Sequence, residues 1–294
     1  MKLKLPVLVA VLFAATAGTA AADTLTKIAE NRKITLAYRD SSVPFSYLEG
    51  PEKPVGLAVD ISNAVAAEVK KRLGLSKLEV AWTPVTSQNR MPLVMNGTVD
   101  LECGSTFNNT TRQKEVGFAV SHFFSGTRLL VKKSSGINDY ANLQGKKVTI
   151  TAGTANIQTM RKYAIDQKID MQFIYAKDHA DALLLVEGDR ASAFAMDDIL
   201  LYGLKANAKE PESLAVVGET LQVEPYACMM RKDDPKFKAL VDGVITGMMK
   251  SGEFERLYNK WFMGPIPPRN QIIGMPMSDQ LKANLKSPSD KAAF

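Results

Sequence analysis

The sequence predicts an α/β protein made of two lobes that are joined by two crossing strands. Strand-like and helix-like segments alternate over residues 33–104 and again over residues 126–207, and such alternation is typical of parallel α/β layers. Two further strand-like segments, 126–133 and 224–232, lie where the chain enters the second series and where it returns from it. Each lobe is therefore expected to hold a central sheet flanked by helices, with two crossover strands between the lobes.

The first 22 residues have the pattern of a secretory signal peptide. Two lysines precede an apolar run from Leu5 to about Ala17, and three alanines end at Ala22. This is the order of a charged start, an apolar core and a cleavage site. The run is short for a membrane span of roughly 20 residues, and an uncleaved anchor is the alternative. The mature protein is expected to begin near Asp23 and to lie outside the cytoplasm.

The composition is that of a globular protein with a mildly basic surface. Of the 294 residues, 46% are apolar and 23% are charged, which is ordinary for a folded domain. The formal net charge is +6, of which the two lysines of the leader supply two, so that the mature chain carries about +4. A charge this small and scattered does not indicate nucleic-acid binding. It suits an anionic ligand and an ordinary solvated surface equally well.

The first series begins with a short helix, expected at residues 26–31. Residues 33–39 alternate and are rich in β-formers, which predicts a strand that ends at Arg39. Apolar residues at helical spacing predict a helix over residues 56–74. The elements that follow are a strand at 77–82, a helix at 89–97 and a strand at 98–104.

The second series repeats the alternation of elements without repeating the sequence. Its segments are strands at 146–151, 171–176 and 191–197, and helices at 155–166, 178–188 and 198–207. After the returning segment 224–232, an apolar-periodic stretch over residues 234–262 predicts two helices.

Polar residues gather where the predicted strands end, which is where parallel α/β layers bind their ligands. They are Arg39, Ser87 and Arg90 in the first series, and Thr154, Asp178, His179 and Asp197 in the second, where Gly153 and Ala155 flank Thr154 in the loop. Helix N-termini at these loops also offer free backbone N–H groups to a carboxylate. Each residue has an ordinary alternative as a helix cap or a solvated side chain, but caps do not require several arginines.

Two cysteines, Cys103 and Cys228, predict one disulfide. An even pair in an oxidising compartment favours a bond between them, and two buried free thiols are the alternative. The two histidines, His122 and His179, lie near neither cysteine in sequence. A zinc site is therefore not expected.

Several segments resemble the periplasmic solute-binding proteins for polar amino acids. The segment GLAVDI resembles the family's first-lobe helix signature, although Ala58 stands where an acidic residue is usual. The stretch ECGSTFNNTTRQ resembles the family's arginine turn at Ser105, Phe107 and Arg112, with Phe107 in place of serine or threonine. Longer runs resemble the glutamate/aspartate-binding subgroup over essentially the whole mature chain: RDSSVPFSY, TSQNR, NGTVDLECGST, AKDHADA, MDD, CMMRKDDP and WFMGPIPPRN.

This resemblance implies a type II periplasmic-binding-protein fold and a role in import. The first lobe would comprise residues 23–127 and 225–294, and the second lobe residues 128–224. The lobes would close on an acidic amino acid through hinges near residues 126–128 and 223–226, and would deliver it to the permease of an ABC transporter. A monomeric periplasmic protein is implied, with no cofactor, no metal and no catalytic residue.

The resemblance also assigns each candidate residue to one part of the ligand. The α-carboxylate would be held by the Arg112 side chain and by backbone N–H groups of Phe107, Thr154 and Ala155. The α-ammonium would be held by Asp197 and by oxygens of Ser105. The side-chain carboxylate would be held by Arg39, Ser87, Arg90 and His179.

The charges of these side chains agree with a dicarboxylic ligand. Three arginines and Asp197 sum to about +2, or about +3 if His179 is protonated, and buried charge without a partner is costly. Two rival functions remain. One is an enzyme on the same fold, with Glu102, Glu224 or His179 as general acid or base. The other is a receptor sensor domain, which the lack of a later apolar span counts against.

Overall fold

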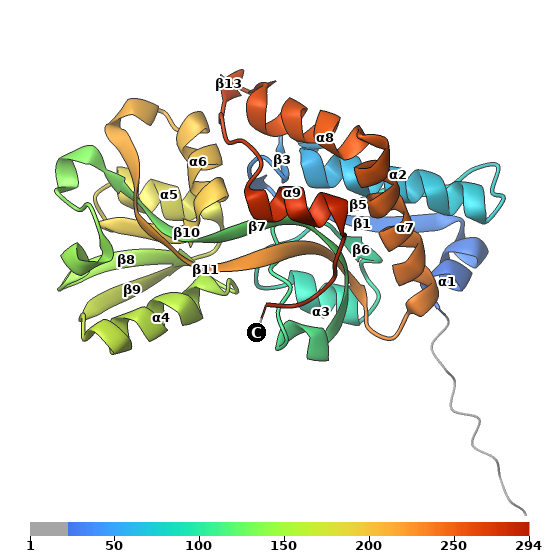
Figure 1. Ribbon diagram of the computed structural model, residues 1–294, viewed down its shortest axis with the longest axis horizontal. Helices are drawn as coiled ribbons and strands as arrows, with labels where there is room; N and C mark the ends of the chain where they lie inside the picture. The colour runs from blue at the N-terminus through green and yellow to red at the C-terminus, as the bar shows by residue number, and fades with distance from the viewer. Residues whose placement is uncertain (1–22, 294) are drawn as a thin grey trace, which may run out of the picture.

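The computed structural model describes residues 23–293, and its centre is an eight-stranded sheet (Figure 1). The strands run in the order β5-β1-β6-β11-β7-β10-β8-β9. Their bounds are β1 (Lys33–Tyr38), β5 (Glu79–Pro84), β6 (Leu101–Glu102), β7 (Val116–Lys132), β8 (Lys146–Thr151), β9 (Met171–Ala176), β10 (Ala193–Asp197) and β11 (Leu214–Arg231). The predicted signal peptide, residues 1–22, lies outside the described residues.

Two long antiparallel strands, β7 and β11, run through the middle of the sheet and connect its two halves. The first lobe holds the parallel strands β5, β1 and β6, and the second lobe holds the parallel strands β10, β8 and β9. Helices flank both halves (Figure 1), so the predicted α/β fold of two lobes with two crossing strands is confirmed. One continuous sheet runs through both lobes in place of two separate sheets.

Both crossing strands are longer than the sequence predicts. The expected ranges 126–133 and 224–232 cover only part of β7 and β11, which begin at Val116 and Leu214. Most side chains of β7 are buried regardless of the face they point to, so no alternation of apolar and polar residues marks its first half. In β11, several register shifts against β7 interrupt the ladder, and such irregularities obscure a strand period of two.

The helices predicted from apolar periodicity are present close to their expected bounds. They are α1 (Thr24–Asn31), α2 (Leu57–Arg72), α3 (Arg90–Met95), α4 (Asn156–Gln167), α5 (His179–Glu187), α6 (Asp198–Asn207), α7 (Pro235–Ser251) and α8 (Glu253–Tyr258). Over residues 23–293, every helix falls short of the length and apolar character that crossing a membrane requires.

Several short elements are absent from the sequence-based prediction because they are too short to show a period. They are the small sheet of β2 (Ser41–Ser42), β3 (Ser46–Leu48) and β4 (Pro54–Val55), the pair β12 (Pro265–Ile266) and β13 (Gln271–Ile272), the helix α9 (Asp279–Lys286), the 3-10 turns η1 (Arg112–Lys114), η2 (Lys133–Ser135), η3 (Tyr140–Leu143) and η4 (Pro211–Ser213), and the π-helical turn η5 (Asn259–Met263).

The two lobes pack against one another through a shared apolar core. In the first lobe, Phe45 contacts Phe123 and Phe262 edge to face at centroid distances of 5.0 and 5.5 Å, and the same buried cluster continues into α5 and α6 of the second lobe. The backbone of Gly203 in α6 lies so close to Val43 that a Cβ on this glycine would be 2.4 Å from the Val43 carbonyl oxygen. The lobes are therefore closed on each other.

Candidate ligand-binding site

Candidate residues from both lobes meet where the lobes face each other, near the ends of β1, β6, β8 and β10, and we call this region the cleft. Arg39, which follows β1, lies with its Nη2 3.3 Å from Nε2 of His179 at the start of α5. Arg112 of the first lobe donates a hydrogen bond of 3.4 Å to the carbonyl of Gly153 after β8. Asp197, at the end of β10, is close enough to Arg112 to raise the pKa of that guanidinium. The ends of the strands thus assemble these residues in one place.

The Arg39 side chain is fully buried and only partly hydrogen-bonded. Its Nη2 donates to Ser87 Oγ at 2.9 Å and to Asp178 Oδ2 at 3.5 Å. Its Nε and Nη1 have no hydrogen-bond partner within residues 23–293. These two atoms are therefore available to an acceptor that enters the cleft. Because an unpaired buried donor is costly, such an acceptor would bind favourably.

His179 is buried beside Arg39 and is neutral at physiological pH. Burial and the nearby Arg39 together lower its pKa to about 3, against the opposing effect of Asp178. Since a guanidinium can only donate, His179 Nε2 must accept from Arg39, and Nδ1 carries the proton toward Thr151 Oγ1 at 2.8 Å. The sequence alone allowed a protonated His179, but in this structure the imidazole is neutral.

Arg90 is buried against the turn at residues 105–113 and lies close to the carboxylate of Glu102. Its Nη1 donates to the carbonyl of Ser105 at 3.1 Å and to the hydroxyl of Thr106, which in turn donates to Glu102 Oε2 at 2.6 Å. Burial lowers the pKa of Arg90 to about 9, and Glu102 opposes that shift. Arg90 Nε has no partner among the described residues. These hydrogen bonds fix the position of the Arg90 guanidinium, and its Nε–H remains available to an acceptor.

Arg112 begins η1 and points back at the turn that carries it. Its backbone N–H donates to Asn109 Oδ1 at 3.0 Å, and its Nη1 donates to the carbonyl of Phe107 at 2.9 Å. Burial lowers the pKa of Arg112, while Glu224 and Asp197 raise it. This fork spans the two lobes, because its other nitrogen reaches the second lobe at Gly153.

Asp197 is the buried carboxylate of the second lobe. Its Oδ1 accepts from Asn156 Nδ2 at 2.7 Å, and its Oδ2 accepts a short hydrogen bond from the hydroxyl of Tyr226. Burial raises the pKa of Asp197 to about 7, although both hydrogen bonds favour the ionised form. An incoming cation would therefore find an acceptor that is already oriented.

The remaining predicted residues lie in the cleft with part of their bonding capacity used. Ser105 Oγ donates to Ser42 Oγ at 3.3 Å, and the ring of Phe107 packs on Tyr226 with centroids 4.9 Å apart. Thr154 Oγ1 donates to the carbonyl of Thr151 at 2.8 Å, so its hydroxyl serves the local turn and does not cap α4, whose N-cap residue is Ala155. Ala155 is the residue that precedes α4.

Cross-lobe contacts close the cleft over these residues. Ser41 Oγ of the first lobe donates to Asp178 and accepts from the Ala180 N–H of the second lobe at 3.2 Å. Gly153 has φ +79, and a Cβ on it would be 2.6 Å from Gln88 Cα. Only glycine fits this approach, because both the left-handed conformation and the missing space exclude a side chain.

The structure adds carboxylates that the charge count from the sequence omits. Glu102 accompanies Arg90, and Asp178 accompanies Arg39. Glu224, on β11, is buried, and burial raises its pKa. Three arginines then face Asp197 and these three carboxylates, and His179 is neutral, so the cleft has no positive excess, in contrast to the sum of about +2 predicted from the sequence. Unpaired buried donors, rather than net charge, therefore indicate an anionic ligand.

Some residues of the cleft were not among the predicted ligand-binding residues. They are Glu102, Thr106, Thr151, Gly153, Asn156, Asp178, Glu224 and Tyr226. The signal for Asp178 is its place at a strand end next to His179, and Thr151 and Asn156 flank the loop after β8. No local pattern marks Tyr226, which enters the site from the returning strand.

The two cysteines form the predicted disulfide. Cys103, after β6, is bonded to Cys228 in β11. The bond therefore joins the end of β6, just before the turn at residues 105–113, to the strand that returns from the second lobe. Within residues 23–293 no cluster of histidine, cysteine or carboxylate side chains has the composition of a metal site.

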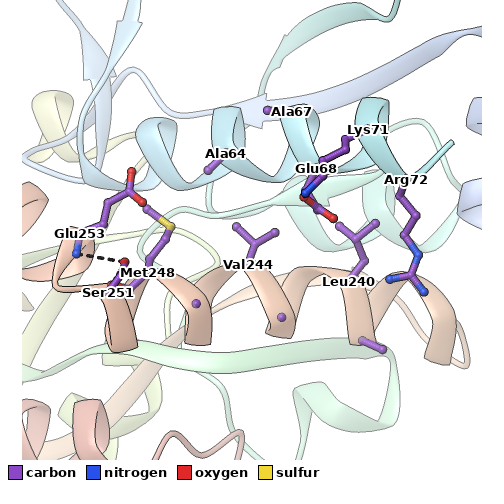
Figure 2. Close-up of a pocket in the computed structure, with 13 residues that line it drawn as sticks. Ala64, Ala67, Glu68, Lys71, Arg72, Leu240, Val244, Met248, Ser251 and Glu253 are labelled. Carbon is purple, nitrogen blue, oxygen red and sulfur yellow. Dashed lines mark hydrogen bonds and ion pairs between the residues drawn. The ribbon is translucent and has the colours of Figure 1, made fainter. Parts of the chain in front are cut away.

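A separate groove on the first lobe does not belong to this site. It has a volume of about 670 Å³ and lies between α2 and α7, with Ala64, Glu68, Leu240 and Val244 on its walls (Figure 2). Its lining includes none of the cleft residues.

Known proteins of similar sequence and structure are bacterial binding proteins. Residues 34–264 match the family model of the bacterial extracellular solute-binding proteins, family 3. A glutamate/aspartate import solute-binding protein of Escherichia coli is 47% identical over 300 residues, covering 99% of both chains. An L-glutamate/L-aspartate-binding protein of Pseudomonas aeruginosa is 49% identical over 271 residues, covering 92% of this chain and 90% of its own.

Solved structures of low sequence identity share the fold. An ABC uptake transporter substrate-binding protein from Streptococcus pneumoniae with bound histidine has a TM-score of 0.72 at 22% identity, covering 82% of this chain and 96% of its own. The match of the family model over most of the chain, together with these relatives, shows that the chain belongs to the bacterial extracellular solute-binding proteins of family 3.

Proposed function

We infer that the protein binds an acidic amino acid, glutamate or aspartate, in the cleft and delivers it to the permease of an ABC importer. The observation that carries this proposal is the set of unpaired buried donors, Arg39 Nε and Nη1 and Arg90 Nε. A carboxylate that accepts from them would remove the cost of leaving them unpaired. The relatives whose names specify glutamate and aspartate support the same ligand class.

The other end of the cleft suits the part that all amino acids share. The Arg112 fork would bind the α-carboxylate, together with backbone N–H groups near Phe107 and Ala155. Asp197 would accept the α-ammonium, with Ser105 oxygens nearby. The fork of arginine and a buried, oriented carboxylate are the groups that these two charges require.

The side chains of Arg39, Ser87, Arg90 and His179 would form the second subsite. Neutral His179 adds no charge there and positions Arg39 through Nε2. A side-chain carboxylate in this subsite would be bound by guanidinium donors from two directions. A neutral amide would satisfy the same donors with a weaker, uncharged acceptor, so that dicarboxylates are favoured.

Ligand capture would use a hinge motion of the two lobes. We place the first lobe at residues 23–127 and 225–294, and the second at 128–224. The strands β7 and β11 cross near residues 126–128 and 223–226, where the register of the ladder shifts. Bends at such irregular positions are a common way for two domains to close around a ligand.

The protein is proposed to act as a periplasmic monomer after removal of residues 1–22, with no catalytic step. Two acid and base candidates of the rival enzyme already have partners within the protein. Glu102 Oε2 accepts a hydrogen bond from Thr106, and both ring nitrogens of His179 are hydrogen-bonded, to Arg39 and to Thr151. Ligand recovered chemically unchanged after long incubation supports binding alone, and a converted product would contradict it.

Calorimetric titration of ligand-stripped protein with glutamate, aspartate and glutamine tests the two subsites. In a first variant, Arg90→Gln is combined with Glu102→Gln, so that one charge of each sign is removed and no buried carboxylate is left unpaired. Binding of glutamate and aspartate should weaken by about 2–3 kcal/mol, roughly 30- to 150-fold. Binding of glutamine should change much less, because its amide never forms the ion pair.

Asp197→Asn is the matched variant for the other subsite. It should weaken glutamate and glutamine by the same factor, since both ligands present the same ammonium. The exposed Arg161→Gln should leave all affinities unchanged. Equal losses of glutamate and glutamine affinity in the Arg90/Glu102 variant would overturn the assignment of the second subsite.

A further inference from the structure

The chain continues beyond the region that matches the family model, and its last described segment contacts the turn at residues 105–113. After α9, which packs on α7 and β7 through the buried Leu281, residues 287–293 run across the sheet toward α3 (Figure 1). We name residues 287–293 the C-terminal strap and residues 105–113 the binding turn. None of the residues of the C-terminal strap is buried, so the strap adds nothing to the apolar core.

The C-terminal strap is hydrogen-bonded to the binding turn along its outer edge. The N–H of Ala293 donates to the carbonyl of Asn108 at 3.1 Å, and the N–H of Thr110 donates to the carbonyl of Ala293 at 3.4 Å. The side chains of Asn108 and Gln113 both donate to the carbonyl of Asp290, at 2.9 and 3.4 Å. A short parallel bridge between strap and turn results.

The middle of the C-terminal strap is anchored to rigid elements. The carbonyl of Ser289 accepts from the N–H of Ser121 in β7 at 2.8 Å. Asp290 Oδ2 pairs with Lys238 Nζ of α7 at 2.8 Å. These contacts hold the strap at a fixed position relative to β7, so that its bonds to the binding turn are contacts with the lobe itself.

The inner edge of the binding turn is bonded to the returning strand β11. The N–H of Asn108 donates to the carbonyl of Pro225 at 2.8 Å, and the N–H of Ala227 donates to the carbonyl of Thr106 at 3.1 Å. The binding turn is therefore held between β11 and the C-terminal strap. Next to the residues so held, Asn109 Oδ1 accepts from the Arg112 N–H, which sets where the Arg112 fork points.

We propose that the C-terminal strap is a positioning element for the α-carboxylate subsite. It fixes the outer edge of the binding turn before the ligand arrives. The entropic cost of ordering the turn and Arg112 on binding is therefore smaller. This inference rests on the proposed function, in which Arg112 binds the α-carboxylate. Because every amino acid carries that group, the strap should change affinity for all ligands and selectivity for none.

Deletion of residues 288–294 from the otherwise complete mature protein tests the role of the strap. Calorimetry should show at least tenfold weaker binding of glutamate, aspartate and glutamine by one common factor, and stopped-flow measurements should show faster dissociation. The urea midpoint of the ligand-free protein should stay near that of the parent, because no buried side chain is removed. A loss confined to glutamate and aspartate would overturn the proposal.

A double-mutant cycle with Arg112→Lys separates positioning from general stabilisation. Lysine lacks the two-pronged guanidinium, so the Arg112→Lys substitution by itself should weaken binding at least tenfold. The deletion should then cost much less in the Arg112→Lys background than in the parent, because coupled sites are not additive. Fully additive losses would overturn the proposal. An unchanged affinity in Arg112→Lys alone would instead refute the proposed carboxylate site.

Two single substitutions keep the test usable if the deletion impairs folding. Ala293→Pro removes the N–H that donates to Asn108, while Ala292→Pro alters a residue whose N–H makes none of these bonds. Affinity should fall several-fold in Ala293→Pro and should fall less in Ala292→Pro. Equal affinities of the two variants would contradict the proposed role of the strap.

Discussion

Asp197 has a pKa that lies close to physiological pH, because several effects on this side chain oppose one another. Burial, with a contribution from the nearby carboxylates of Asp198 and Glu224, raises the pKa to about 7. The hydrogen bonds from Tyr226 and Asn156 favour the ionised form and limit the rise. In the proposed function Asp197 pairs with the ligand ammonium, so its proton release and ligand binding are expected to be coupled.

Affinity for glutamate should rise with pH up to about 7 and then level off. Below its raised pKa, Asp197 is protonated in the ligand-free protein, and this proton must leave before the carboxylate can pair with the ligand ammonium. Well below the pKa, the affinity should change by about tenfold per pH unit. Calorimetry in buffers of different ionisation enthalpy measures both the affinity and the protons released.

The variant Asp197→Asn provides the control, since it should bind weakly with no such pH dependence. His179, whose pKa is lowered to about 3, should stay neutral over the same range and contribute nothing. Affinity that decreases as pH rises would contradict this account, because it would indicate a protonated histidine in the second subsite.

At the scale of elements, the loop between β8 and α4 fits the first lobe only because Gly153 has no side chain. Its φ of +79 and its approach to Gln88 both exclude a Cβ in the closed molecule. Gly145, which immediately precedes β8, also has a positive φ of +68, but a Cβ on it would meet nothing within 4 Å. A substitution at Gly145 would therefore introduce backbone strain alone, whereas one at Gly153 would introduce both backbone strain and a steric clash with the other lobe.

Gly153→Ala should weaken ligand binding at least tenfold, whereas Gly145→Ala should leave it nearly unchanged. Both variants should lose about 1–2 kcal/mol of stability, since alanine is strained in the left-handed region. Only Gly153→Ala opposes closure, because its Cβ collides with the other lobe. Titration with glutamate and urea unfolding of both variants measure the two effects, and equal affinities would show that closure does not need this contact.

At the scale of the whole molecule, the disulfide closes a loop that contains the entire second lobe. Cys103 and Cys228 are separated by 125 residues, and both crossing strands lie largely inside that loop. A bond across so long a loop restricts the unfolded chain strongly. The returning strand β11 is tied in this way to the binding turn.

Replacing both cysteines by alanine should lower the free energy of unfolding by about 3–5 kcal/mol. Urea unfolding of the parent with and without reductant should show the same loss, and the double variant should be insensitive to reductant. Thiol labelling of unreduced, unfolded parent protein should detect no free cysteine. Two labelled thiols would refute the bond.

The sequence by itself determined the fold class and the residue types that line the cleft. Apolar periodicity located the helices α2 and α7, and the strand ends located Arg39, Arg90 and Asp197, because both signals are local. The full length of the crossing strands and the short elements were not predicted, because burial on both faces, irregular register or shortness removes the period that such a prediction needs.

Only the tertiary structure decided what surrounds those residues. The neutral state of His179 follows from burial beside Arg39, and the carboxylate behind Arg90 is Glu102, which lies 12 positions away in the chain. The contact of the C-terminal strap with the binding turn joins segments far apart in sequence. Burial and long-range contacts set pKa values, partners and the positions of donors, and these quantities depend on how the chain folds and not on any local pattern.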